Sequence, residues 1–369
     1  FFLVSFKQAK QSLFTDDLVV KFQKVSLKDL YSFTLQLHNT VGTGVPLLTS
    51  LKTIVEGSKN KKLVRIMDEM ITDLKGGSSL SKALAKHPKV FSEFYVSMIE
   101  LGESSGKLSQ TVGSLALYIK KDMEIKHRIR AAMTYPMCVA CIGAGLISYI
   151  LGYIMPQFIE IFSKEKVALP LPTIILLTLS HVVTHYWWMI LILIIAMVIG
   201  FRYFSHTDFG RLFVDRLRLR LPVIGNVARK ICAKRFIDGI HLLYVSGFPL
   251  LGALNIVKSM LDNKHLEKTI DALWVHISTG KDFASYLWLG DFFPADVVAM
   301  IRSGEESGTL DKMLEKISEI FHDEVNHAID GLISAFEIGI IILMGMLVGF
   351  AAMAILFPIF SLSKIASGG

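Results

Sequence analysis

Two glutamates occupy the same position in two copies of one short motif. Gly102 to Leu108 reads G-E-S-S-G-K-L and Gly304 to Leu310 reads G-E-E-S-G-T-L, so Glu103 and Glu305 are equivalent. A carboxylate at a tight turn can cap backbone amides, or it can be exposed and meet a basic residue of a partner protein. The sequence leaves both interpretations of Glu103 and Glu305 open.

The glycines and the lysine of this motif raise the question of phosphate binding. A Walker loop has four residues between its first glycine and Gly-Lys, and Ser or Thr follows the lysine. Here three residues intervene, Leu108 follows the lysine, and Thr309 replaces the lysine in the second copy. The spacing argues against a nucleotide site. It favours a helix–helix turn, in which a glycine ends one helix and Ser105 or Ser307 lies near the N-cap of the next.

A third carboxylate, Glu337, stands just before an apolar run. An ionisable residue inside a membrane helix is a functional candidate, but at the interface its side chain can also extend into water. Both interpretations stay open. The histidines show no ligand spacing, and Cys138 and Cys141 lie within an apolar stretch. We therefore expect no catalytic residues, no metal and no cofactor.

Composition and hydropathy place the chain in a membrane. Hydrophobic residues make up 52% of the 369 residues, yet 19% are charged and the net charge is +7. Mean hydropathy is +0.50. This mixture predicts a few membrane spans joined to sizeable polar parts. Basic residues also flank membrane spans on the cytoplasmic side, and we find no basic–aromatic pattern typical of a nucleic-acid-binding protein.

Three apolar segments predict membrane spans, because about 20 apolar residues cross the hydrocarbon core. The first is Met137–Met155, an uncharged run between two prolines. In the second apolar region we expect an interfacial helix over Leu171–Thr184 and a span core over Trp187–Phe201, with tryptophans as a belt. The third is Ile338–Phe357, which Pro358 closes.

The distribution of lysine and arginine predicts the orientation of these spans. Many basic residues precede the first span or follow the second, whereas only Lys164 and Lys166 stand between the two. Cytoplasmic loops carry an excess of such residues. We therefore expect the N-terminus and the long segment after span two to be cytoplasmic, and the loop between spans one and two to lie outside.

An internal repeat defines the organisation of the chain. Thr43 to Leu48 recurs as Ser246 to Leu251 at an offset of 203 residues, and the G-E-x-S-G motif recurs at an offset of 202. Residues at four-residue spacing, such as Phe33 and Leu37, predict helices in each copy. In the first motif a glycine suits a helix C-cap, and the proline two residues on suits the start of the next helix.

We therefore predict an all-α membrane protein with two tandem-duplicated cytoplasmic helical bundles and three transmembrane helices. The expected segments are an N-terminal tail (1–26), cytoplasmic copy 1 (27–130), transmembrane helix 1 (135–156), an outer loop with an interfacial helix (157–186), transmembrane helix 2 (187–204), cytoplasmic copy 2 (205–336), transmembrane helix 3 (338–360) and a short outer tail (361–369).

These motifs, taken in order, resemble those of a known family. G-V-P-L-L, G-G-S-S-L-S-x-A-L (Gly76–Leu84), H-P-x-x-F (His87–Phe91) and G-E-S-S-G-x-L lead into Tyr135-Pro136 and a span. The chain resembles the inner-membrane platform proteins of type II secretion and type IV pilus machines (the GspF/PilC family). It departs from the family where Ile338 follows Glu337 in place of proline, and where copy 2 reads G-K-D-F-A-S-Y-L (Gly280–Leu287). The second departure suggests that the contacts of the two copies have diverged.

The resemblance implies a scaffold without enzymatic activity in the bacterial inner membrane. Such a protein would couple a cytoplasmic assembly ATPase to the insertion of pilin or pseudopilin subunits into a fibre, together with other inner-membrane assembly proteins and membrane lipid. A homodimer is expected, because the fibre grows on an axis. The alternative is a component of a small-solute transporter, since transporters often have duplicated halves. Three spans with few central charges count against that alternative.

The two copies differ strongly in charge. Residues 33–136 contain 15 Lys/Arg and 9 Asp/Glu, whereas residues 236–337 contain 7 Lys/Arg and 16 Asp/Glu. The acidic copy 2 could meet a basic surface, either on the ATPase or on a neighbouring copy 1, or it could simply be a solvated surface. Asp311, Glu315 and Glu319 are the candidate contact residues.

Overall fold

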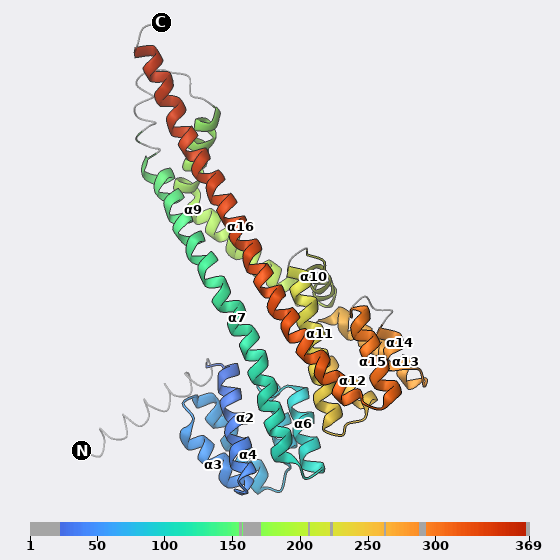
Figure 1. Ribbon diagram of the computed structural model, residues 1–369. Helices are drawn as coiled ribbons and strands as arrows, with labels where there is room; N and C mark the ends of the chain where they lie inside the picture. The colour runs from blue at the N-terminus through green and yellow to red at the C-terminus, as the bar shows by residue number, and fades with distance from the viewer. Residues whose placement is uncertain are drawn as a thin grey trace, which may run out of the picture. The chain divides into compact units, whose positions relative to one another are not determined.

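The described part of the chain is helical throughout (Figure 1). The computed structural model describes residues 23–154, 157, 171–205, 207–221, 224–261, 263–287 and 293–366, and these ranges contain no strand. The predicted all-α class is confirmed. Most of the expected N-terminal tail, residues 158–170 of the expected outer loop and the last three residues lie outside the described ranges.

The chain divides into two compact units. The first, here the helical unit, comprises residues up to His127 together with Ala228–Asn326, and the second, here the span unit, comprises Arg128–Val227 and His327–Gly369. Both predicted cytoplasmic copies contribute to the helical unit. The segment 205–227 groups with the span unit by its contacts.

Six helices form each copy, and they follow one another in the same order. Copy 1 consists of α2 (Leu27–Gly42), α3 (Leu47–Gly57), α4 (Lys61–Lys75), α5 (Leu80–Ala85), α6 (Glu93–Ser104) and the first part of α7 (Leu108–Tyr149). Copy 2 consists of α11 (Ile224–Val245), α12 (Leu250–Lys258), α13 (Lys264–Ser278), α14 (Phe283–Leu287), α15 (Ala295–Ser307) and the first part of α16 (Leu310–Ala366). This order agrees with a tandem duplication.

The repeated T/S-G-x-P-L-L motif forms the turn between the first two helices of each copy. Gly44 has φ 83° and Gly247 has φ 93°, a left-handed conformation that side chains other than glycine rarely adopt. The next helix begins directly after Pro46 in copy 1 and after Pro249 in copy 2. The predicted turn is therefore confirmed in both copies.

Equivalent aromatic residues anchor the two hydrophobic cores. Phe33 on α2 and Phe236 on α11 are both buried. In copy 1 a buried hydrogen bond of 3.0 Å joins the hydroxyls of Thr34 and Tyr95, so that the polar end of the tyrosine is satisfied inside the core. Phe236 has an isoleucine, Ile237, where Phe33 has Thr34, and the core of copy 2 therefore lacks the threonine hydroxyl at this position.

The last helix of each copy continues without interruption into an apolar segment. α7 has 42 residues and passes through Pro136, and α16 has 57 residues and passes through Pro358. The prolines that border the apolar runs thus lie inside these two helices. A proline removes one backbone hydrogen bond, but a membrane helix tolerates it because neighbouring groups satisfy the freed carbonyl. Part of the expected outer tail thus belongs to α16.

Two helices of the described residues are long and apolar enough to cross a membrane. They are Leu108–Ile154, in which a π-helical turn (η1, Ile150–Ile154) follows α7, and Leu310–Phe350. The third expected span lies in α9 (Leu171–Phe204), where Tyr186 has non-helical angles (φ −112°, ψ 18°). This kink separates the expected interfacial helix from an apolar helix Leu191–Phe204. At 1.5 Å per residue that helix is about 21 Å long, shorter than the hydrocarbon core.

Within the span unit, α7 and α16 contact each other at equivalent positions of the repeat. Arg128 on α7 donates from one guanidinium nitrogen to both carboxylate oxygens of Asp330 on α16, each at 2.9 Å, and these residues stand 202 positions apart. Further along, a Cβ at Gly143 would overlap the side chain of Met344. The end of the Met344 side chain thus occupies the space that a side chain at position 143 would take.

Candidate functional site

Glu103 caps a helix that comes from an earlier motif of the same copy. One carboxylate oxygen accepts a hydrogen bond from the Leu80 amide at 2.6 Å. The other accepts from the Ser81 amide at 3.1 Å and from the Ser81 hydroxyl at 2.5 Å. Ser79 caps the amide of Lys82, so the first three amides of α5 all have acceptors. The carboxylate thus caps backbone amides, but those of the short helix α5 rather than of its own turn.

Glu305 makes the corresponding contact in copy 2. Its two carboxylate oxygens accept from the amides of Phe283 at 2.9 Å and Ala284 at 3.2 Å, the first two residues of α14. Alanine at position 284 has no hydroxyl, so the third hydrogen bond of copy 1 has no counterpart here. This is one contact in which the two copies have diverged, as the sequence of Gly280–Leu287 suggested.

The glycines of the motif make the glutamate contact possible. A Cβ at Gly102 would lie 3.0 Å from the Cα of Leu108, and one at Gly304 would lie 3.1 Å from the Cα of Leu310, so consecutive helices pack backbone to backbone. The second glycine of each motif has a left-handed conformation, with φ near 69°. Ser105 and Ser307 end the preceding helices, so their expected place near the next N-cap is wrong. In each copy the left-handed glycine, Gly106 or Gly308, follows the serine, and one more residue separates this glycine from the start of the next helix.

The three acidic candidates of copy 2 share one face of α16. Asp311, Glu315 and Glu319 are spaced by four residues, which places them one above another on a helix. Glu315 and Glu319 are exposed, and Asp311 is half-buried. The corresponding positions of α7 are Ser109, Gly113 and Leu117, none of which carries a charge.

Glu315 and Glu319 line a cleft between the two copies in the helical unit. The cleft has a volume of about 260 Å³. One wall is α7, which contributes Lys107 and Lys121, and the opposite wall is formed by α11 and α16. Basic residues of copy 1 thus face acidic residues of copy 2 across the cleft. Both apolar residues, such as Leu117, and hydroxyl-bearing residues line its remaining surface.

His241 is the titratable group on the α11 wall of this cleft. Burial lowers the pKa of His241 below the ordinary value of 6.5, although the nearby carboxylates of Glu315 and Asp238 act in the opposite direction. Lys121 on the facing wall adds to the lowering. The imidazole of His241 is consequently neutral near pH 7. Its counterpart in copy 1, His38, instead lies 2.8 Å from the carbonyl oxygen of Ser109.

A half-buried ion pair joins the two copies beside the cleft. Arg235 on α11 donates to Asp122 on α7 at 2.8 Å, and Lys126 lies 2.8 Å from the other oxygen of Asp122. Burial alone would raise the pKa of Asp122, but the positive charges of Arg235 and Lys126 outweigh it, and the pKa is lowered. This pair could not be predicted from the repeat, because Asp122 and Arg235 do not stand at equivalent positions.

A second buried charge stabilises the α11 wall from within copy 2. The Lys234 side chain is 1% exposed and pairs with Asp238 one turn later. Asp238 also accepts a hydrogen bond of 2.5 Å from Ser318 on α16. A buried charge is costly unless it is paired and hydrogen-bonded. The only sequence signal for this cluster was the spacing of Lys234 and Asp238 by four residues.

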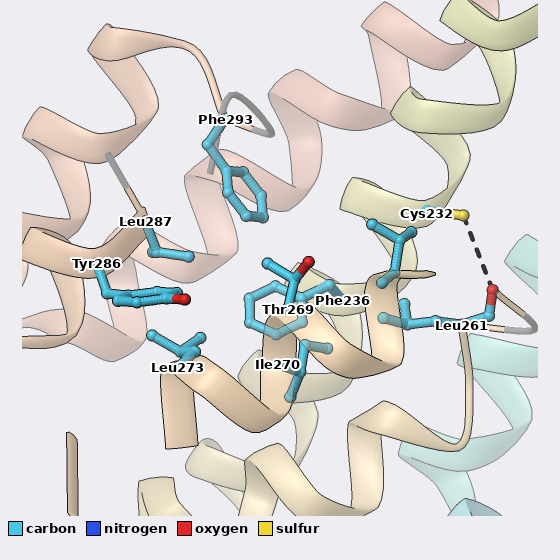
Figure 2. Close-up of a pocket in the computed structure, with 10 residues that line it drawn as sticks. Cys232, Phe236, Leu261, Thr269, Ile270, Leu273, Tyr286, Leu287 and Phe293 are labelled. Carbon is cyan, nitrogen blue, oxygen red and sulfur yellow. Dashed lines mark hydrogen bonds between the residues drawn. The ribbon is translucent and has the colours of Figure 1, made fainter. Parts of the chain in front are cut away.

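Copy 2 also contains a small apolar cavity (Figure 2). Figure 2 shows Tyr286 and Leu287 on one side and Cys232 and Leu261 on the other, with Thr269 between them. Its volume of about 40 Å³ is far below the several hundred Å³ of typical ligand pockets. The cavity is therefore a packing defect of copy 2 rather than a binding site.

The family was established by comparison with known proteins. The profile of the family described as Type II secretion system (T2SS), protein F, matches residues 33–156 and again residues 236–358. The chain belongs to this family. The two matches begin at Phe33 and Phe236, the equivalent core residues of the two copies, and they leave out α9 and the helix that follows it.

Individual members of the protein F family cover nearly the whole chain. A type IV pilus assembly protein PilC of Thermus thermophilus is 36% identical over 91% of this chain and 83% of its own length. PilC of Pseudomonas aeruginosa is 32% identical over 93% of this chain and 92% of its own length. A type II secretion system protein F of Xanthomonas campestris is 31% identical over 91% of this chain and 83% of its own length. The resemblance inferred from the motifs is confirmed.

Glu337 belongs to a different unit from the other candidate functional residues. It is half-buried on α16 and belongs to the span unit, whereas Glu103, Glu305 and the acidic face belong to the helical unit. Within the described residues its carboxylate takes part in no hydrogen bond or ion pair. The described residues also contain no group of three or more His, Cys, Asp or Glu side chains that could hold a metal ion.

Proposed function

We propose that the chain is an inner-membrane platform protein of a type IV pilus or type II secretion machine. It couples a cytoplasmic assembly ATPase to the insertion of pilin or pseudopilin subunits into the fibre, and it catalyses no reaction itself. Membership of the protein F family supports this role. The observation that carries the coupling is the continuity of α7 and α16, each of which begins in the core of one copy and extends through an apolar segment.

A continuous helix is suited to transmitting motion. Displacement of a copy moves the first turns of its long helix, and the helix passes the displacement along its axis, although Pro136 and Pro358 each remove one backbone hydrogen bond. At 1.5 Å per residue, α16 measures about 85 Å. Work done on a copy on the cytoplasmic side can thereby reach the bilayer, where the subunits reside.

The proposed topology follows the distribution of basic residues. Three spans at 135–156, 187–204 and 338–360 place the N-terminus and both copies in the cytoplasm, and the loop 157–186 outside. Lysines and arginines cluster before the first span and after the second, which supports this orientation. A reporter active only outside the cytoplasm should work in the loop 157–186 or after Ser361, and it should be inactive near Gly57 or Asn263.

The acidic face of α16 is the proposed contact for the ATPase. Among the described residues Asp311, Glu315 and Glu319 form no salt bridge with copy 1, so their charge is available to a basic surface. Opposite potentials would set the encounter rate and orientation. Glu103 and Glu305 have a different role in this proposal: by capping α5 and α14 they keep each copy rigid.

Copurification of the full-length chain from its own membrane tests the proposed function. We expect a cytoplasmic ATPase and pilin-like subunits to copurify, and the ATPase to be lost when Asp311, Glu315 and Glu319 are changed to their amides. A matched control changes three exposed acids of copy 2 outside the cleft, Asp271, Asp296 and Glu306, to amides. If neither ATPase nor pilin-like subunits accompany the unaltered chain, the proposal is wrong.

Glu337 is proposed as a coupling carboxylate between the cytoplasmic part and the bilayer. Its place on α16, just before the apolar run, motivates this role. Glu337→Gln should leave folding and membrane level unchanged while abolishing fibre assembly. Normal assembly in this variant would show that the side chain merely extends into water. Size determination of the detergent-purified chain, in which we expect a homodimer, completes the test.

A further inference from the structure

Helix α10 (Asp208–Arg220) exposes a continuous apolar stripe. Phe213, Leu217 and Leu221 are spaced by four residues and are 54%, 46% and 39% exposed. Ile224, the first residue of α11, is also apolar and is 44% exposed. Side chains at this spacing lie on one face of a helix. Four large apolar side chains are thus left open to the surroundings.

The opposite face of α10 is packed against the protein. Gly210, Val214, Asp215 and Leu219 are buried. Among the residues of α10 whose side chains the structure describes, the exposed charged ones, Arg211 and Arg216, are both positive. A helix that buries one face and offers large apolar residues together with arginines on the rest has the character of a helix lying at a membrane surface.

A tight turn fixes α10 at the end of α9. The carbonyl oxygen of Phe204, the last residue of α9, accepts from the amide of Thr207 at 3.1 Å and from its hydroxyl at 2.7 Å. Thr207 in turn caps α10 by accepting from the Gly210 amide at 3.1 Å. A Cβ at Gly210 would overlap the Phe204 carbonyl oxygen, so only glycine permits this approach.

The first part of α10 therefore lies directly against the last residue of α9. The rings of Phe204 and Phe213 are 6.5 Å apart and perpendicular, which ties the apolar stripe to the same end of α9. Arg202 precedes this end, as expected of a cytoplasmic boundary. If α9 leaves the bilayer at Phe204, α10 begins at the level of the lipid headgroups.

We propose that α10 lies in the plane of the cytoplasmic membrane surface and binds anionic phospholipid. Phe213, Leu217 and Leu221 insert among the acyl chains, about 5 to 10 Å into the headgroup boundary. Arg211 and Arg216 contact the negatively charged headgroups. This inference rests on the second span of the proposed topology, and it assigns a lipid-binding role to a segment that the family profile does not match.

Spin labels in the full-length chain test the proposal. Cys138, Cys141 and Cys232 are replaced by serine, and single cysteines are introduced at Phe213 or Leu217 and labelled with a nitroxide. The chain is reconstituted in vesicles of phosphatidylcholine, with or without one part in three of phosphatidylglycerol. Collision with oxygen, which partitions into the bilayer, is compared with collision with a water-soluble nickel complex.

Two further label positions separate the possible failures. Ile195 lies in the apolar part of α9 and reports the span itself. Val275 on α13 is 54% exposed, like Phe213, and belongs to the helical unit, so it is the matched water-exposed control. A label at Ile195 that collides mainly with nickel would refute the second span, and with it the proposed topology, independently of α10.

We expect oxygen to dominate at positions 195, 213 and 217, with a ratio several-fold above that at position 275. The ratio at 213 and 217 should rise further in vesicles that contain phosphatidylglycerol, and the combined change Arg211→Gln and Arg216→Gln should remove this rise. If labels at 213 and 217 collide mainly with nickel, α10 faces water and the proposal fails. If they are shielded from both reagents, a protein surface covers the stripe, which also overturns it.

Discussion

Replacing Glu103 by alanine should loosen α5 without unfolding the rest of the chain. The substitution removes the acceptor of three hydrogen bonds, two from backbone amides and one from the Ser81 hydroxyl. Leu80 is fully buried, so water does not easily replace the carboxylate at its amide. A lost hydrogen bond to a charged group costs about 1.5–3 kcal/mol, but Glu103 is only half-buried. We expect a local destabilisation of about 2–4 kcal/mol.

Hydrogen exchange measured by mass spectrometry on the full-length chain in lipid nanodiscs provides the assay. Amides of α5 exchange through local opening, and each 1.4 kcal/mol changes the opening equilibrium about tenfold. The expected destabilisation corresponds to exchange about 30-fold to 700-fold faster in peptides that contain Leu80 to Ala85. Amides of α14 in copy 2 should exchange at their original rate, because Glu305 caps this helix.

Three further variants test whether Glu103 stabilises α5 by capping its amides. Glu103→Gln keeps an oxygen acceptor and should cost about half as much as alanine. Glu305→Ala removes one hydrogen bond fewer and should loosen α14 less than Glu103→Ala loosens α5. Glu100→Ala changes an exposed glutamate one turn earlier on α6 and is the matched control. Equal exchange of α5 in the Glu103→Ala and Glu100→Ala proteins would refute the capping role of Glu103.

Three further predictions concern the contact between the copies and the cavity. Arg235→Gln should lower stability by about 1–3 kcal/mol at pH 7. Because the folded pKa of Asp122 is lowered, the stability that Arg235→Gln loses should shrink as the pH falls below about 4. Thermal unfolding of both proteins at pH 7 and below pH 4 measures this change. The lowered pKa of His241 means that its contribution is complete above about pH 6.5 and is lost as the pH falls. His241→Gln should therefore flatten the decline of the unfolding temperature between pH 7.5 and 5.5, and an unchanged decline would contradict this. Thr269→Ile introduces the residue that copy 1 has at the equivalent position, Ile66. The larger side chain should fill part of the 40 Å³ cavity and stabilise copy 2 by up to about 1 kcal/mol. A lower unfolding temperature would instead indicate overpacking.

Local features of the fold were predictable because they depend on residues close in sequence. The turn at Gly44 and Pro46 needs one left-handed glycine and a proline, and both copies contain them in the same order. Apolar residues at four-residue spacing sufficed to predict α2 and α11. The continuity of the helices through Pro136 and Pro358 is harder to predict, since whether a helix tolerates a proline depends on its surroundings and not on the proline alone.

Contacts across the repeat could not be predicted in the same way. The internal repeat identifies positions that are equivalent in the two copies, and the shared motif identifies Glu103 and Glu305 in this way. The helix that each glutamate caps lies 22 residues earlier and depends on packing of the whole copy. Asp122 and Arg235 stand at positions whose counterparts, Glu324 and Ser32, do not pair with each other. Only the folded arrangement of the helical unit brings them together.

This unlike pairing bears on how a duplicated gene loses its symmetry. If two identical copies meet across a two-fold axis, every contact between them occurs twice with the same pair of residues. The ion pair between Asp122 and Arg235 now requires an acid in the first copy and a base in the second, and Glu324, the counterpart of Asp122, pairs instead with Lys230 of its own copy. Neither half can be exchanged for the other without losing this contact. The two copies now complement each other at this contact. A chimera that combines copy 1 of one related chain with copy 2 of another is expected to work only when Asp122 and Arg235 come from the same parent.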